Sequence, residues 1–194
     1  MISNPVLDCI RSRRSTRHFD EQQIQPQQLD ALLEAAIWAP SGGNSQSWLF
    51  TAIQNRKLLL ELNTVVRQAF QHWMPDDDYP AKLNAKTKAQ DENYNFYYHA
   101  PTLIIAANRP GYANAMADCS LALENIFLAA ESLGLGSCYI NQLHWLRDDE
   151  NVRAFLYELG IPRKHIICNA AAIGYIKKPS DIPPRKENTI KIIT

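Results

Sequence analysis

The chain has 194 residues, of which 46% are hydrophobic and 21% charged, and its 20 basic and 20 acidic side chains give a formal net charge of zero. This length and composition predict one globular domain, residues 1–194, with a substantial core. Zero net charge argues against a protein whose main role is to bind a nucleic-acid backbone or an anionic membrane, since both roles need an excess of Lys and Arg.

The first part of the chain contains three predicted helices and one strand. Asn4 followed by a proline is a typical helix start, and this helix runs into the sequence RSRRSTRHF. A second helix is predicted from Pro26, because leucines and alanines recur there at intervals of three and four residues, and Pro40 ends it. The apolar run 48–53 predicts a strand, and residues 57–70 predict a third helix.

Residues 72–101 differ in character from the rest of the chain, because aromatic side chains are scattered there among acidic and then basic ones. Long irregular connections in compact domains are commonly functional lids or disordered segments, and the aromatic content favours a lid. We therefore expect residues 67–98 to form a lid-like insertion. A surface flap with ordinary packing is the alternative, and we give it equal weight.

The middle of the chain carries its most apolar segments. Residues 102–108 form a continuous apolar run, which is typical of a strand buried on both faces. The longest predicted helix covers residues 113–133, is apolar or small on nearly every side, and ends at Gly134. Such a helix lies either in the middle of a domain or against another subunit.

The last part of the chain predicts a strand at 136–141, a helix at 148–159 and a strand at 166–176. Helices and strands mix without strict βαβ alternation, so we predict an α+β fold with helices layered on a sheet. The Pro-rich tail from Lys177 is expected to be extended. It either frays or wraps a neighbouring molecule, and its apolar end favours wrapping.

A basic cluster follows the first helix. Four arginines within seven positions are interleaved with hydroxyl side chains: Arg11, Arg13, Arg14 and Arg17 with Ser12, Ser15 and Thr16. Guanidinium groups and hydroxyls donate the hydrogen bonds that a phosphate monoester accepts. The cluster is therefore a candidate phosphate site, and a solvated basic turn is the alternative, because short basic runs are common.

The loop SGGNSQ, residues 41–46, places two of the chain's 7 glycines side by side. Glycine permits close approach of the backbone to another group. The amides of Asn44 and Gln46 each offer a donor and an acceptor, which suits the edge of a ring with imide and carbonyl groups. An ordinary loop is the alternative, since Gly, Ser and Asn are common in turns.

Four segments, in this order, resemble the nitroreductase-like flavoprotein family: RRSTRHF (13–19), PSGGNSQSW (40–48), AAESLGLGSCYI (129–140) and AAIGYIKKPSDIPPRK (171–186). The resemblance spans almost the whole chain, with residues 67–98 as the main exception. It implies an α+β fold with a central, mostly antiparallel sheet flanked by helices, in an interlocked homodimer. It also implies two FMN sites at the subunit interface, a central dimer helix at 113–133 and a tail, 177–194, that wraps the partner.

The resemblance also implies which residues bind FMN. The phosphate and ribityl chain would contact Arg13, Arg14, Ser15 and Arg17, and Arg185 would close on the phosphate. The loop reaching the flavin from the other subunit would carry Pro40, Ser41, Gly42, Asn44 and Gln46. Asn141 and Gln142 stand where the family commonly has a pair such as Gly-Gly or Glu-Gly, whose backbone approaches the flavin N5. The side chains of Asn141 and Gln142 would narrow the flavin pocket or add a hydrogen-bond donor to it.

By the same resemblance, the chain would be an enzyme in which NADH or NADPH reduces the flavin and a nitroaromatic, quinone or similar acceptor reoxidises it. This is ping-pong hydride transfer through flavin N5, and no side chain is expected to be catalytic, because the sequence shows neither paired carboxylates nor a hydrolytic triad. Two alternatives remain open. One is a flavin-using relative that dehalogenates its substrate or breaks down flavin, and the other is a non-catalytic phosphate- or nucleotide-binding module.

The cysteines and the absence of apolar segments bear on location. The four cysteines are widely spaced, without a CxxC pair or a His at zinc-ligand spacing: Cys9, Cys119, Cys138 and Cys168. We therefore expect no metal site. No segment approaches the roughly 20 apolar residues of a membrane span, and the first residues lack a signal-peptide segment. A cytoplasmic protein with reduced thiols is expected.

Overall fold

The computed structural model of the protein describes residues 2–194 and is built around one four-stranded sheet. The strands are β1 (Trp48–Ile53), β2 (Thr102–Asn108), β3 (Leu135–Ile140) and β4 (Ile166–Tyr175). Their order across the sheet is β1-β2-β4-β3, and every neighbouring pair is antiparallel. This confirms the predicted α+β class and the antiparallel sheet, and it puts β2 and β4 in the centre.

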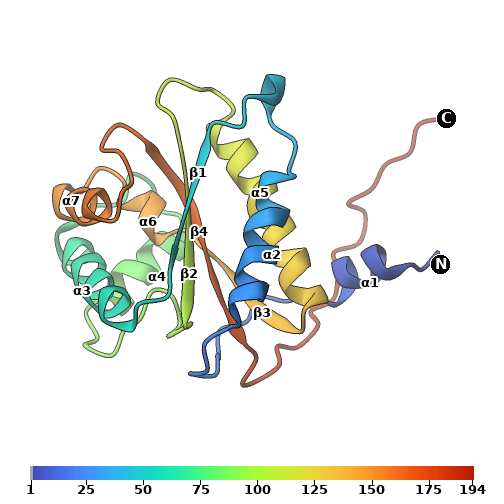
Figure 1. Cartoon of the computed structure of the whole chain (residues 1–194), viewed down its shortest axis with the longest axis horizontal. Coiled ribbons are helices and arrows are strands. Elements are labelled where there is room, and N and C mark those ends of the chain that lie inside the picture. Colours follow the sequence, from blue (N-terminus) through green and yellow to red (C-terminus); the bar gives the residue numbers. More distant parts are fainter. Residues whose placement is uncertain (1) are drawn as a thin grey trace.

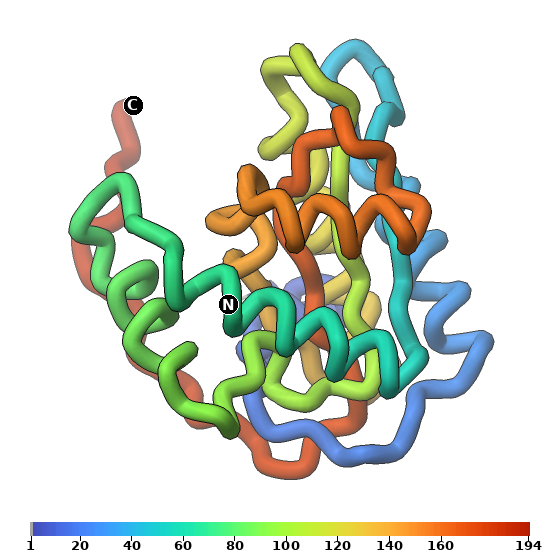
Figure 2. The backbone as a smooth tube through the Cα atoms, turned by 90° about the vertical axis from the view of Figure 1, so that its left-hand side faces the viewer, coloured from blue at the N-terminus to red at the C-terminus, as the bar shows by residue number. Residues whose placement is uncertain are grey.

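Helices cover both faces of the sheet (Figure 1). They are α1 (Pro5–Ser12), α2 (Pro26–Ile37), α3 (Arg56–His72), α4 (Pro80–Lys88), α5 (Ala115–Ser132), α6 (Gln142–Trp145) and α7 (Glu150–Glu158), with a short 3-10 turn, η1 (Gly42–Asn44). One face carries α3, α4, α6 and α7, and the other carries α2 and α5. Figure 2 shows α3 and α7 lying side by side across the first face.

The core has two halves, one on each face of the sheet. In β2 every residue is buried, and successive side chains alternate between the halves: Leu103 and Ile105 pack toward α3 and α7, whereas Ile104 packs toward α2 and α5. This explains why residues 102–108 read as a continuous apolar run, since both faces of the strand are covered.

Local signals account for the helix ends. The Asn4 side chain accepts a hydrogen bond of 2.9 Å from the backbone N–H of Leu7, which caps α1 as predicted. Helix α5 ends at Ser132, and Gly134 follows in the left-handed region with φ of 70°, which glycine adopts without strain. The predicted helices and strands are all present, with ends shifted by a few residues.

Two helices escaped prediction. Helix α4 lies inside residues 72–101, where no helix was predicted, and whether residues 67–98 act as a lid stays a prediction. Only Ala85 of α4 is fully buried, which leaves the mostly polar helix without the apolar periodicity that predicts helices. Helix α6 has 4 residues, too few to show a periodic pattern. Helix α3 also extends to His72 and occupies the start of the proposed insertion.

Residues 177–194 form no helix or strand and are exposed along their whole length. The apolar side chains at the end of this tail are more than four-fifths exposed: Ile190 83%, Ile192 81% and Ile193 84%. Whether they wrap a partner stays a prediction, as does the homodimer itself. Among residues 2–194, no helix combines the length and apolar character needed to cross a lipid bilayer.

Candidate active site

The arginine cluster lies along the free edge of β3. Ser15 pairs with Ser137 as an isolated parallel bridge, and the backbone N–H of Thr16 donates a 2.8 Å hydrogen bond to the Ser137 carbonyl. A Cβ at Gly136 would lie 2.6 Å from the Thr16 hydroxyl oxygen, so this close approach depends on glycine. The edge of the sheet therefore holds the backbone of the cluster in place.

A cavity of about 230 Å³ joins this cluster to the start of the tail. Its lining residues are Arg13, Arg14, Ser15, Arg17, Ser180, Asp181, Pro183 and Arg185. The Ser180 hydroxyl donates a 3.1 Å hydrogen bond to the Ser15 carbonyl, which ties the tail to the cluster. Four arginines face one aspartate here, so the cavity is electropositive and suits an anion.

Two arginines of this cavity have donors to spare. The Nε atoms of Arg13 and Arg14 are buried and make no hydrogen bond. Glu124 lies 3.5 Å from the Arg13 Nε, within ion-pair distance but without hydrogen-bond geometry. A buried guanidinium donor without a partner is costly, and a phosphate oxygen would satisfy it. Arg13, Arg14, Ser15, Arg17 and Arg185 thus line one cavity, and that they bind an FMN phosphate stays a prediction.

A second cavity, of about 350 Å³, shares Arg17 with the first. Its other lining residues are Ala81, Asn84, Ala85, Lys88, Tyr94, Asn95, Phe96, Tyr98, Tyr139, Asn141, Gln142 and Trp145. The Arg17 guanidinium carbon lies 5.7 Å from the Tyr98 ring centroid. Burial lowers the pKa of Arg17, but Tyr98 and Cys138 outweigh this and raise the pKa above its ordinary value. Arg17 therefore stays cationic where the two cavities meet.

Asn141 and Gln142 line the second cavity, and their predicted approach to the flavin N5 stays a prediction. The Gln142 side-chain N–H donates a 3.3 Å hydrogen bond to the Tyr94 hydroxyl oxygen. Burial raises the pKa of Tyr94 to about 12, although this hydrogen bond acts in the opposite direction. Gln142 therefore occupies part of the second cavity and donates one hydrogen bond to the Tyr94 hydroxyl.

Asn95 is a site residue that sequence reasoning missed. Its side chain is 8% exposed, and its Oδ1 accepts hydrogen bonds from the backbone N–H groups of Tyr97 (3.1 Å) and His99 (2.8 Å). Asn95 lines the second cavity, and its Nδ2 is buried without a hydrogen-bond partner. Tyr98 and His99 both have φ of 57°, a left-handed conformation that costs energy in residues other than glycine. The only sequence signal for this residue was a polar side chain, Asn95, among the aromatic residues of NYNFYY (93–98).

The loop predicted to reach the flavin of the other subunit packs, at Gly42, on the start of α5 in its own chain. The Gly42 N–H donates to both Asp118 carboxylate oxygens at 3.2 Å, and the Tyr112 hydroxyl donates a 2.9 Å hydrogen bond to the Gly42 carbonyl. A Cβ at Gly42 would lie 2.1 Å from the Asn114 side-chain nitrogen. Within the chain, glycine at position 42 allows the Asn114 side chain to pack closely against the loop.

The rest of this loop is exposed and available. Pro40 and Asn44 are exposed, and Ser41 and Gly42 are partly so. The Gln46 amide donates a 2.8 Å hydrogen bond to Asn44 Oδ1, and both residues have positive φ, 44° and 53°. Their amides are thus fixed relative to each other at the tip of the loop.

Within one chain, this loop and the arginine cluster lie at opposite ends of the sheet (Figure 1). The loop leads into Trp48, which pairs with Asn108, and Asn108 in turn pairs with Ile166. Ser15 lies beside Ser137, which pairs with Ile173 on the same strand β4. From Ile166 to Ile173 is roughly 23 Å along the strand, and the four spacings between Trp48 and Ser15 add about 19 Å across the sheet. One chain therefore does not bring both predicted halves of the site together.

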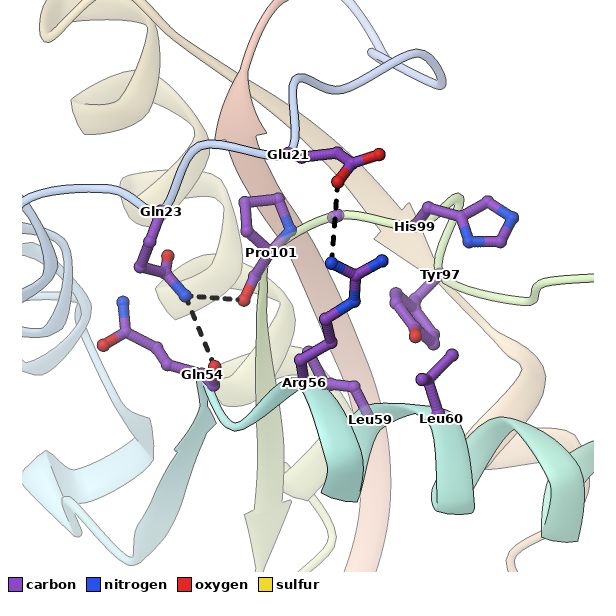
Figure 3. A pocket seen from close by; sticks show the side chains of 10 residues that line it. Glu21, Gln23, Gln54, Arg56, Leu59, Leu60, Tyr97, His99 and Pro101 are labelled. Carbon is purple, nitrogen blue, oxygen red and sulfur yellow. Dashed lines mark hydrogen bonds and ion pairs between the residues drawn. The ribbon is translucent and has the colours of Figure 1, made fainter.

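A third cavity, of about 310 Å³, contains none of the predicted site residues (Figure 3). Arg56 and Glu21 form a 3.5 Å ion pair across it, and the Gln23 side-chain N–H donates to the Pro101 carbonyl at 2.8 Å. Because these polar groups pair with one another, they are not available to bind a phosphate or the edge of a flavin ring. Among residues 2–194, no group of three His, Cys, Asp or Glu residues is placed to hold a metal ion.

Two solved nitroreductase structures have the same fold as this chain. A nitroreductase from Bacteroides fragilis, solved with bound FMN, superposes with a TM-score of 0.89 and is 41% identical, covering 99% of this chain and 100% of its own. A nitroreductase with bound FMN from Desulfitobacterium hafniense has the same fold, with a TM-score of 0.84, 24% identity and full coverage of both chains.

Sequence comparison leads to the same group of proteins. A protein of Archaeoglobus fulgidus that carries a provisional assignment as an NADH dehydrogenase/NAD(P)H nitroreductase is 29% identical over 175 residues, 90% of this chain and 87% of its own. The model of the nitroreductase family matches residues 10–175. This match includes β1 to β4, the arginine cluster and the second cavity. The chain therefore belongs to the nitroreductase family.

Proposed function

We propose that this protein is an FMN-dependent NAD(P)H oxidoreductase that reduces nitroaromatic, quinone or similar acceptors. The observation that carries the proposal is the pair of cavities that meet at Arg17. One is electropositive and contains the buried Nε donors of Arg13 and Arg14, which make no hydrogen bond, and the other is lined by aromatic and amide side chains. A ligand with a phosphate joined to a flat polar ring fits these two cavities, with the phosphate in the first and the ring in the second. The bound FMN of the 41% identical nitroreductase supports the same ligand here.

Each cavity has a defined role in this proposal. Arg13, Arg14, Ser15 and Arg185 bind the phosphate, and Arg17 bridges from the phosphate side to the ring side. The unpartnered Asn95 Nδ2 donates to the edge of the ring, with Asn141 and Gln142 beside it. FMN supplies two-electron transfer between a nicotinamide and an acceptor, while the protein orients the ring and excludes water. The positive charge of Arg17 favours negative charge on the reduced ring.

The site is completed by a second copy of the chain. Pro40, Ser41, Gly42, Asn44 and Gln46 lie far from the arginine cluster of their own chain, so in the proposal the partner's loop reaches the ring. Apolar side chains left exposed on one side of the molecule support a homodimer: Val6 64%, Ile10 47%, Ile37 55%, Trp38 78% and Leu121 47% exposed. Large apolar side chains exposed in this way are typical of an interface.

In the proposed cycle the nicotinamide and the acceptor occupy the second cavity in turn, which gives ping-pong kinetics. No residue is assigned an obligatory acid–base role, because the ionisable groups of this cavity are Arg17, Lys88 and three tyrosines. Protons come from solvent. Dehalogenation, or breakdown of flavin, by the same site is the second candidate, and a non-catalytic phosphate-binding module is the third.

The first test is the visible absorption spectrum of the purified protein before and after addition of FMN, followed by NADH or NADPH without oxygen. We expect bound oxidised flavin that bleaches with at least one nicotinamide and recovers on addition of a quinone or nitroaromatic. Bound flavin that neither nicotinamide bleaches would favour the dehalogenating or flavin-consuming relatives. A protein that binds no FMN would refute the proposal and leave the phosphate-binding module.

A further inference from the structure

Gln142 and Tyr94 form an unusual polar pair on the wall of the second cavity. Gln142 follows the end of β3, where the resemblance implies a small residue, and its side-chain N–H donates to the Tyr94 hydroxyl oxygen at 3.3 Å. Both side chains are partly buried and line the cavity. A hydrogen bond between the first residue of α6 and one of the 72–101 segment thus sets the direction of the phenol.

The backbone of Tyr94 is held as well as its side chain. The Asn63 amide on α3 donates a 2.9 Å hydrogen bond to the Tyr94 carbonyl, and its oxygen accepts one of 3.1 Å from the Phe96 N–H. Asn63 therefore clamps the segment on both sides of Asn95. A group held at both its main chain and its hydroxyl loses little further freedom when it meets a ligand.

The Tyr94 hydroxyl retains one unspent donor. A phenol has one hydrogen to donate and accepts through its oxygen. Gln142 occupies the oxygen as a donor, and no residue in the described part of the chain accepts the Tyr94 hydrogen. The Tyr94 hydroxyl hydrogen is therefore available to donate a hydrogen bond to a molecule bound in the cavity.

We propose that Tyr94, positioned by Gln142, donates a hydrogen bond to an oxygen atom of the electron acceptor. The inference rests on the proposed function and narrows the acceptors to those whose oxygen gains negative charge on reduction, such as quinones and nitroaromatics. A neutral donor fixed in a partly buried cavity stabilises that developing charge without having to reorganise. The proton stays on Tyr94: reduction of a quinone to a hydroquinone takes a hydride equivalent from NAD(P)H and one proton from solvent.

The experiment uses the full-length FMN-loaded enzyme and follows reoxidation after NAD(P)H has reduced it. In Tyr94→Phe we expect the rate with a quinone to fall roughly 10-fold or more, since hydrogen bonds to charged groups are the strong ones. Ferricyanide accepts electrons without such a hydrogen bond, so its rate should stay within about 2-fold, below the effect of a single ordinary hydrogen bond. Gln142→Leu should give an intermediate loss with the quinone, because the phenol is present but unoriented. Tyr157→Phe, on α7, is the matched control and should match wild type with both acceptors.

A binding measurement without turnover completes the test. With no reductant present, 4-nitrophenolate should bind Tyr94→Phe roughly 10-fold more weakly than wild type, since a charged oxygen loses its donor. Equal loss of quinone and ferricyanide rates, or unchanged binding of 4-nitrophenolate, would overturn the role of Tyr94. Failure of NAD(P)H to reduce the flavin would instead refute the proposed function, and the phenolate titration would still decide on the hydroxyl.

Discussion

Arg14 offers the sharpest test of the phosphate site, because its guanidinium is already fixed. Its Nη1 donates to the Arg13 carbonyl, and its Nε is buried without a partner. In Arg14→Gln the phosphate loses one charge-assisted hydrogen bond, worth about 1.5–3 kcal/mol. The Kd for FMN should therefore rise roughly 10- to 150-fold. Arg14→Lys keeps the charge but loses the planar guanidinium, so its Kd for FMN should lie between the values for wild type and Arg14→Gln.

The assay is titration of the apoprotein with FMN, with binding monitored by the quenching of flavin fluorescence. The same titration is repeated with riboflavin. Riboflavin lacks the phosphate, so its affinity should be the same for wild type and Arg14→Gln. Arg153→Gln serves as the control protein: Arg153 donates to the His165 carbonyl at 2.7 Å and lines neither the phosphate cavity nor the second cavity. Its FMN affinity should equal that of wild type.

Two results would refute the reasoning. An Arg14→Gln protein that binds FMN as tightly as wild type would show that the cavity beside β3 does not hold the phosphate. Equal weakening of FMN and riboflavin would show that the substitution disturbs the ring site or the fold, and that the phosphate contact is not the cause.

Three further predictions follow from other parts of the molecule. Gly42→Ala should lower the free energy of unfolding by about 1–3 kcal/mol in urea titrations, because its Cβ would overlap the Asn114 side chain, and an unchanged midpoint would contradict this packing. Burial raises the pKa of Tyr94 to about 12 from an ordinary value of 10.0, so the unfolded chain releases this proton first as pH rises. The stability of wild type relative to Tyr94→Phe should therefore hold below about pH 10 and fall by about 2–3 kcal/mol toward pH 12, and parallel curves would refute it. Removal of residues 187–194 keeps Arg185 but deletes the exposed isoleucines, so sedimentation should detect a weaker dimer with FMN still bound, whereas an unchanged dimer would exclude the tail from the interface.

Most of the elements could be predicted from the sequence because their signals are local. The cap at Asn4, the continuous apolar run of β2 and the glycine after α5 each act within a few residues. Helix α4 could not be predicted, since its polar sequence has one fully buried residue and its place depends on the elements around it. Asn95 was missed for the same reason: its unpartnered amide becomes visible only when Tyr98 and His99 adopt their left-handed turn.

The sequence by itself determined the order of the strands and of all helices except α4 and α6, the α+β class and the arginine cluster as a candidate phosphate site, because periodicity, caps and clustered charge are properties of neighbouring residues. Only the tertiary structure decided that Arg185 returns to Arg14, that Gln142 contacts Tyr94, and that the loop at Gly42 lies at the far end of the sheet from the cluster. These relations join residues far apart in the chain, and the pairing of the strands and the packing of helices on both faces of the sheet set their positions.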